Sequence, residues 1–304
     1  MKCIICAIAK QENAYLYEWA KYHLDMGFSS IHLYDNNDVD GEKVLDVFAG
    51  TEVEGRVTVH DVRGMKYMQK VVYQECYDKE EFDWCAFIDI DEFITFTLAS
   101  GYKTIESFLK DKDGWEAVHL NWMCYGDGDT VSNDGRLVLE RFKNPIMPVG
   151  FYYSYMDWPE NSHVKSIIRK GVSIDWCGDE VANKSNPHTP AGLKRVCNSL
   201  GQQVQNEPFS DVFHEKAFVR HFMTKTIEEY AVKVARQCAD CEAVLYTFPK
   251  FFRVNRITFS KLSWLKMHFP QIKVLDCIKE RWKYLILDYR LPFRFVFRSL
   301  RNCK

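Results

Sequence analysis

The sequence has no long apolar run. None of its hydrophobic stretches approaches the roughly 20 residues that a membrane-spanning helix requires. The apolar residues 3–9 are followed at once by Gln11, Glu12 and Asn13, without a small-residue cleavage site. We therefore expect them to belong to the fold rather than to a signal peptide. Internal repeats and low-complexity segments are also lacking, which excludes a collagen-like chain.

The chain also carries almost no net charge. Its 40 lysines and arginines nearly balance 42 aspartates and glutamates, for a formal net charge of −2. A domain that binds nucleic acid usually has a strongly basic surface, so we expect no nucleic-acid partner. Hydrophobic residues make up 47% of the 304 residues, which is enough for a sizeable core and excludes a disordered chain.

A regular disulfide framework is lacking as well. The eleven cysteines are odd in number and irregular in spacing, so we expect reduced thiols and a cytoplasmic protein. Two C-x-x-C pairs occur, Cys3/Cys6 and Cys238/Cys241. The first pair lies in a predicted strand, where residues three apart point to opposite faces. We therefore expect no structural zinc at these pairs.

Strands and helices alternate in the first part of the chain. Short apolar runs predict strands at residues 3–9, 31–34, 57–60 and 84–88, and helical spacing predicts helices at 15–26, 41–48 and 65–76. This order predicts an α/β fold with a mostly parallel, Rossmann-like sheet and helices on both faces. Ligands bind such sheets beyond the carboxyl ends of the strands. Those ends carry Lys10, Glu12, Asp35, Asn36, Asp89 and Asp91.

The rest of the chain is less regular. Further strands are predicted at residues 116–122 and 163–169, with a Gly- and Asp-rich loop, YGDGD, at 125–129. Thr226 and Glu229 have the spacing of a capping box and predict a helix that runs through Cys238. We predict one principal domain over residues 1–245 and a helical C-terminal segment over 246–304.

The end of the chain is basic and aromatic. Residues 279–304 contain eight lysines and arginines against two acidic residues, and phenylalanines are interleaved with the arginines. Such a segment can lie on an anionic membrane surface, as a peripheral contact at the inner face of the cell membrane. A helix that packs on the body of the protein with a solvated basic side is the alternative.

Two aspartates form the main candidate site. Asp89 and Asp91 follow the fourth predicted strand, two residues apart, so both side chains can point the same way. Glu92 adds a third carboxylate. Like charges this close are costly unless a cation cancels them, and carboxylate and phosphate oxygens are ligands of Mg²⁺ and Mn²⁺. A solvated acidic turn at a helix start is the structural alternative.

A D-x-D pair at a strand end occurs in two chemistries. In haloacid-dehalogenase-like phosphatases the first aspartate is a nucleophile on the first strand, and threonine or valine stands two places after the second. Here the pair follows the fourth strand, and Phe93 occupies that place. The order agrees better with sugar-nucleotide transferases, in which the pair holds a metal ion on the diphosphate.

The chain resembles GT-A glycosyltransferases of the family 2-like and family 92-like group. The resemblance rests on five segments that span most of residues 3–237 in the family's order. They are CAIAKQENAYLYEWAKYHLDMGFSSIHLYDNND, QKVVYQECYDKEEFDWCAFIDIDEF, LNWMCYGDGDT, HVKSIIRK and VRHFMTKTIEEYAVKVARQ. It implies a GT-A fold and a nucleotide-sugar donor, with UDP as the expected nucleotide.

The resemblance also implies roles for residues that bind the donor. It places Ala9, Lys10 and Glu12 beside the nucleotide, and Asp35 toward its base or ribose. Loop solvation and helix capping are the alternative for these groups. Further candidates for contact with the nucleotide, sugar or diphosphate are Gln69, Tyr73, Lys165, Arg169 and His188. The alternative for Tyr73 is packing in the core. The alternative for Lys165, Arg169 and His188 is solvation at the surface.

Metal and base assignments follow in the same way. Asp91 is the first expected metal ligand, and Asp89 binds the metal or the ribose. His221 resembles a second protein ligand, although a histidine after an apolar pair is usually a core residue. Asp127 and Asp129 are the candidate catalytic bases, since their glycine-flanked loop can approach a sugar; a simple turn is the alternative.

The sequence therefore predicts a metal-dependent glycosyltransferase, and the resemblance implies that it inverts the anomeric centre. It would move a sugar from a nucleotide donor to a saccharide or lipid-linked acceptor, in surface polysaccharide synthesis. A nucleotidyltransferase or phosphatase that uses the same carboxylates is the rival within the enzymes. A non-catalytic nucleotide-binding protein is the rival outside them.

Overall fold

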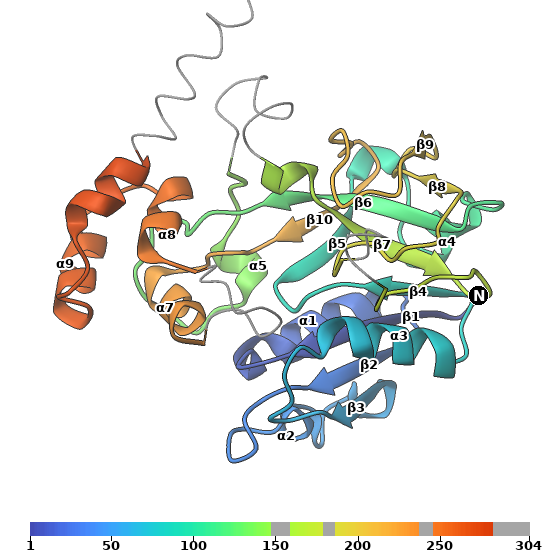
Figure 1. Cartoon of the computed structure of the whole chain (residues 1–304), viewed down its shortest axis with the longest axis horizontal. Helices are drawn as coiled ribbons and strands as arrows, with labels where there is room; N and C mark the ends of the chain where they lie inside the picture. The colour runs from blue at the N-terminus through green and yellow to red at the C-terminus, as the bar shows by residue number, and fades with distance from the viewer. Residues whose placement is uncertain (147–158, 179–185, 237–245, 282–304) are drawn as a thin grey trace, which may run out of the picture. The chain divides into compact units, whose positions relative to one another are not determined.

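The computed structural model describes residues 1–146, 159–178, 186–236 and 246–281 (Figure 1). Of these, the residues up to Met123 and from Glu160 to His221 form one compact unit, unit 1. The remaining described residues form a second, unit 2. The boundary that the sequence predicts after residue 245 stays a prediction.

Unit 1 is built on a single sheet. Its strands lie in the order β3-β2-β1-β4-β7-β6-β10-β5, and the first four of these run parallel. β7 is antiparallel to both β4 and β6, and β10 is antiparallel to β5. The bounds are β1 (Cys3–Ala9), β2 (Ser30–Asp35), β3 (Val57–Asp61), β4 (Trp84–Phe87), β5 (Glu92–Phe96), β6 (Ala117–Cys124), β7 (Val164–Arg169), β8 (Val196–Cys197), β9 (Gln203–Val204) and β10 (Ala217–His221).

Helices cover both faces of this sheet. α3 (Gln69–Lys79) packs on the face that presents Ile4 and Cys6, with Val72 and Tyr73 in the shared core. Ile5 and Ala7, which alternate with Ile4 and Cys6 along β1, point to the other face, because side chains alternate along a strand. α1 (Asn13–Asp25) contacts β2 and β5 there. The other helical segments of unit 1 are α2 (Val44–Phe48), η1 (Glu54–Arg56), η2 (Leu98–Ser100) and α4 (Ile105–Lys110).

The predicted α/β class and the first four strands are confirmed. Each predicted strand overlaps an observed one, because buried apolar runs bounded by polar turns leave few other solutions. The antiparallel pair β5 and β10 is missing from the predictions. β5 begins at Glu92, directly after the two aspartates, and its register places His221 of β10 opposite Glu92.

Unit 2 contains α5 (Val138–Arg141), α7 (Ile227–Arg236), α8 (Phe248–Val254) and α9 (Phe259–His268). η3 (Pro159–Ser162) begins at the last residue of the first stretch of unit 2 and continues into unit 1 along the sequence. Ile227, Phe251 and Leu265 are fully buried in the core of unit 2. The predicted capping box is confirmed: the Glu229 amide donates to Thr226 Oγ1 (3.2 Å) and the Thr226 amide to Glu229 Oε2 (3.0 Å).

Some predictions fall on parts of the chain that the structure does not describe. These are the Cys238/Cys241 pair and residues 282–304 of the basic segment. Among the residues that are described, no helix is both long enough and apolar enough to cross a bilayer.

Candidate functional site

The loops after β1 and β2 are tied together at the carboxyl edge of the sheet. The Asn36 amide donates to the Ala9 carbonyl (2.8 Å), and the Gln11 amide donates to Asn37 Oδ1 (2.6 Å). Gln11 takes a φ of +54°, in the left-handed region, which turns the chain sharply after β1. The chain then enters α1 through Glu12, which is buried. The edge thus has a fixed backbone where a donor nucleotide is expected.

Asp35 organises this edge from within. Its two carboxylate oxygens accept hydrogen bonds from the amides of Asn37 (3.0 Å) and Val44 (2.9 Å), and the side chain is buried. Lys10 Nζ lies 3.3 Å from Asp38 Oδ1. The structure therefore brings Ala9, Lys10 and Asp35 to the same edge, as the sequence predicts.

Asp89 is the meeting point of three predicted site residues. Gln69 Nε2 donates to its Oδ1 (2.8 Å), and the Tyr73 hydroxyl lies 3.4 Å from the same oxygen. Lys165 Nζ donates to Oδ2 at 2.7 Å. The Asp89 side chain is 34% exposed, so it is both held in place and open to a ligand.

Lys165 lies beneath the carboxylates rather than at the surface. Its side chain is 1% exposed and its Nζ also lies 3.5 Å from Glu92 Oε2. Burial lowers the pKa of Lys165, but the carboxylates of Asp89, Glu92 and Asp91 outweigh it and hold the pKa above its ordinary value. This ammonium group therefore neutralises the cluster from the side of the core.

Glu92 is the deepest of the three carboxylates. It is fully buried, and its Oε2 accepts the Asp89 amide (2.9 Å). Burial raises the pKa of Glu92 well above its ordinary value, and the charge of Lys165 acts against this. Glu92 thus fixes the backbone that presents Asp89.

Asp91 and His221 face each other across the antiparallel pair. Asp91 Oδ2 and His221 Nε2 are 3.6 Å apart, and both side chains are 10% exposed. Two ligands of one divalent ion, each about 2.1 Å from it, lie about 3 to 3.5 Å apart, so the observed separation exceeds the upper end of that range by only about 0.1 Å. A carboxylate oxygen and an imidazole nitrogen are a donor set that suits Mn²⁺ or a similar ion. The residues present therefore fit a divalent cation.

Aromatic rings support His221. The ring centroid of Trp122 lies 4.0 Å from that of His221 and 4.6 Å from that of His163, on which it stacks. His188 also contacts Trp122, and its Nδ1 lies 3.1 Å from the Val164 carbonyl. Burial lowers the pKa of His188 well below its ordinary value. Sequence reasoning missed Trp122 and His163, which no spacing in the sequence links to the aspartates.

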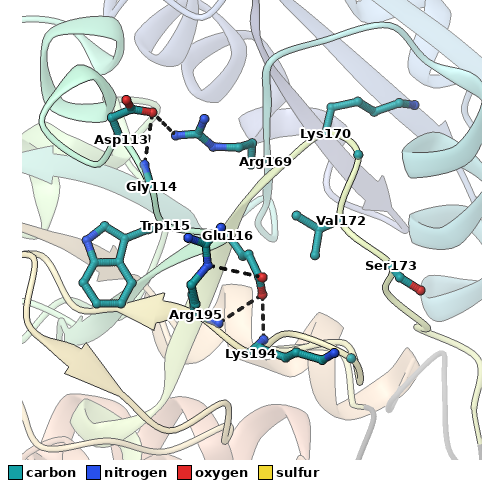
Figure 2. Close-up of a pocket in the computed structure, with 12 residues that line it drawn as sticks. Asp113, Gly114, Trp115, Glu116, Arg169, Lys170, Val172, Ser173, Lys194 and Arg195 are labelled. Carbon is teal, nitrogen blue, oxygen red and sulfur yellow. Dashed lines mark hydrogen bonds and ion pairs between the residues drawn. The ribbon is translucent and has the colours of Figure 1, made fainter.

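Arg169 lies elsewhere in unit 1. It pairs in register with Trp84 at the start of β4, whereas Asp89 follows the end of that strand. Its guanidinium donates to Asp113 Oδ1 (3.0 Å) and lines a pocket of about 460 Å³, in which Arg195 pairs with Glu116 (Figure 2). The structure therefore does not bring Arg169 to the aspartates.

The two candidate bases belong to unit 2. Lys261 Nζ lies 2.5 Å from Asp127 Oδ2 and 3.2 Å from Asp129 Oδ1, and Arg256 lies 3.1 Å from Asp129 Oδ2. Burial raises the pKa of Asp127, and its bond to Lys261 acts in the opposite direction. Asp129 is 43% exposed, so its carboxylate is the more accessible of the two. Their role as base stays a prediction.

Comparison with known proteins identifies one family. A sequence model described as glycosyltransferase family 92 matches residues 3–170. A family 92 protein of rice, Os08g0121900, is 32% identical over 110 residues, which are 35% of this chain and 18% of the rice protein. Galactan beta-1,4-galactosyltransferase GALS2 of Arabidopsis thaliana is 30% identical over 125 residues, 37% of this chain and 24% of that protein.

The chain thus spans less than a quarter of the length of these two relatives. Among solved structures, S. aureus TarS is similar at 11% sequence identity with a TM-score of 0.38, over 88% of this chain and 46% of TarS.

Proposed function

The chain belongs to glycosyltransferase family 92, and we propose that it is a metal-dependent, inverting glycosyltransferase with a UDP-sugar donor. The acceptor would be a saccharide or a lipid-linked saccharide in surface polysaccharide synthesis. The observation that carries this proposal is the convergence of Asp89, Asp91 and His221 beside the tied loops at the carboxyl edge of the sheet. The galactosyltransferase name of the Arabidopsis relative makes UDP-galactose the first donor to try.

Asp91 and His221 are the proposed protein ligands of Mn²⁺ or Mg²⁺. A bound ion would supply positive charge to the diphosphate of the donor, which makes the nucleoside diphosphate a better leaving group. Asp89 would bind the ribose or the ion, held for that purpose by Gln69 and Lys165. Because Lys165 is buried, we assign it to positioning Asp89 rather than to contact with phosphate.

The remaining residues would bind the nucleotide and move the proton. Ala9, Lys10, Glu12 and Asp35 form the edge that supports the nucleotide. Asp127 or Asp129 would take the proton of the acceptor hydroxyl as its oxygen attacks the anomeric carbon. The bond from that carbon to the phosphate oxygen breaks, and its electron pair leaves with the nucleoside diphosphate.

A transfer assay with product analysis tests the proposal. UDP-galactose and other UDP-sugars are incubated with the full chain, Mn²⁺ and oligosaccharide acceptors, and the products are identified by mass spectrometry. We expect a new glycosidic bond, and we expect Asp91→Asn to abolish it. A nucleotide joined to a sugar phosphate, or phosphate released from simple esters, would favour the rival chemistries. Donor binding without turnover that survives Asp91→Asn would favour a binding protein.

A further inference from the structure

A second group of metal-ligating side chains lies away from the aspartates, in unit 1. His32 stands in the middle of β2 and His60 near the end of the neighbouring β3. The parallel register pairs His32 with Thr58 and Tyr34 with His60, so both histidines point to the same face of the sheet. Glu80 follows α3, the helix that covers this face.

Two of the three distances among these side chains match those around a tetrahedral ion, and the third is no longer than 4.8 Å. His32 Nδ1 lies 3.3 Å from His60 Nε2 and 3.4 Å from Glu80 Oε1, and all three ligand atoms lie within 4.8 Å of one another. Ligand atoms about 2.0–2.1 Å from a tetrahedral zinc ion are about 3.3–3.4 Å apart. We propose that His32, His60 and Glu80 bind a divalent ion of the zinc class, with water in the fourth position.

Direct contacts among these groups satisfy them less well than an ion would. His32 Nδ1 faces a nitrogen and a carboxylate oxygen at once, and a single N–H can point well at only one of them. An ion at the centre would accept a lone pair from each of the three atoms. Two imidazoles and one carboxylate are a donor set that proteins use for zinc with an open position.

The surroundings hold these side chains in place. The His60 ring stacks on Tyr34 at 4.5 Å, and Lys170 Nζ donates to the Glu80 carbonyl at 2.7 Å. His32 stands three residues before Asp35, or about 10 Å along the strand, so the cluster lies away from the carboxyl edge.

The test uses the full chain with Asp91→Asn and His221→Ala, which removes the ligands proposed for the donor site. After treatment with a chelator, we expect calorimetric titration with zinc chloride to find one site. Adding Glu80→Gln or His60→Gln should weaken zinc binding at least about 100-fold, because a ligand is lost. Glu75→Gln, which removes a carboxylate of α3 that pairs with Lys79, should leave zinc binding unchanged.

Cobalt(II) in place of zinc gives an independent readout. We expect the visible absorption of a four-coordinate ion with nitrogen and oxygen ligands. The buried thiols of Cys76, on α3, and of Cys6 and Cys85, on the strands that α3 covers, belong to the same core cluster. Their coordination would add a strong near-ultraviolet thiolate band. That band, the absence of any zinc site, or a zinc affinity unaltered by both Glu80→Gln and His60→Gln would overturn the proposal.

Discussion

The substitution Lys165→Met tests how the acidic cluster is held together. Lys165 is 1% exposed and is 2.7 Å from Asp89 and 3.5 Å from Glu92, so the change removes the only cation that any described contact places on these two carboxylates. Removing one partner of a buried ion pair usually costs about 3–5 kcal/mol. We expect a loss of that size in the free energy of unfolding of unit 1 at pH 8.

The loss should depend on pH. Burial already raises the pKa of Glu92, and the charge of Lys165 opposes this shift, so Lys165→Met raises the pKa further. A carboxyl group whose pKa is raised by folding destabilises the folded state as the pH rises through the range between its unfolded and folded values. The cost of Lys165→Met should therefore be smaller at pH 5 than at pH 8.

Urea unfolding followed by tryptophan fluorescence at both pH values measures this cost. Lys110→Met is the matched control, because Lys110 pairs with Glu106 at the surface, 64% exposed, and should cost less than about 1 kcal/mol. If Lys165→Met costs no more than the control, or costs the same at both pH values, the assigned role is wrong. Unchanged stability together with lost donor binding would instead indicate direct contact with phosphate.

Three further changes have expected outcomes of their own. His221→Ala should weaken Mn²⁺ binding at least about 10-fold in calorimetric titration. An unaltered Mn²⁺ affinity would show that His221 packs in the core and does not bind the ion. Arg141→Met breaks a buried pair with Glu229, 2.8 Å apart, and should cost about 3 kcal/mol at pH 7. Burial raises the pKa of Glu229, but its bonds to Arg141 and Thr226 outweigh burial and lower the pKa below its ordinary value. The stabilisation that the ion pair gives should therefore fade as the pH falls below the ordinary range of a glutamate. A stability loss in Arg141→Met that is independent of pH would contradict this. Deleting residues 279–304 should reduce binding to anionic vesicles, whereas a truncated protein that no longer folds would show a structural role for the segment.

The sequence predicted those parts of the fold that depend on local patterns. The strands at 3–9 and 84–88 are apolar runs that end in polar turns, and the capping box of Thr226 and Glu229 is a spacing rule. β5 was missed because it is short and follows directly on Asp91, where a helix start or a turn was equally plausible. Its partner β10 comes more than a hundred residues later, so the pairing has no local signal.

The candidate site divides in the same way. The position of Asp89 and Asp91 at a strand end was visible in the sequence, because strand ends and ligand sites coincide in this class of fold. The depth of Lys165 was not visible, since spacing alone does not distinguish a buried cation from one that faces a ligand. The Asp127–Lys261 ion pair joins residues 134 apart, and only the folded chain brings them together.

The central claim is that Asp91 and His221 hold a divalent ion against the diphosphate of the donor. The most direct measurement is an anomalous difference map from crystals of the protein grown with MnCl₂ and UDP. The account predicts a manganese peak within about 2.2 Å of Asp91 Oδ2 and His221 Nε2, in contact with phosphate oxygens of UDP. Bound UDP with no manganese between these two side chains would contradict it.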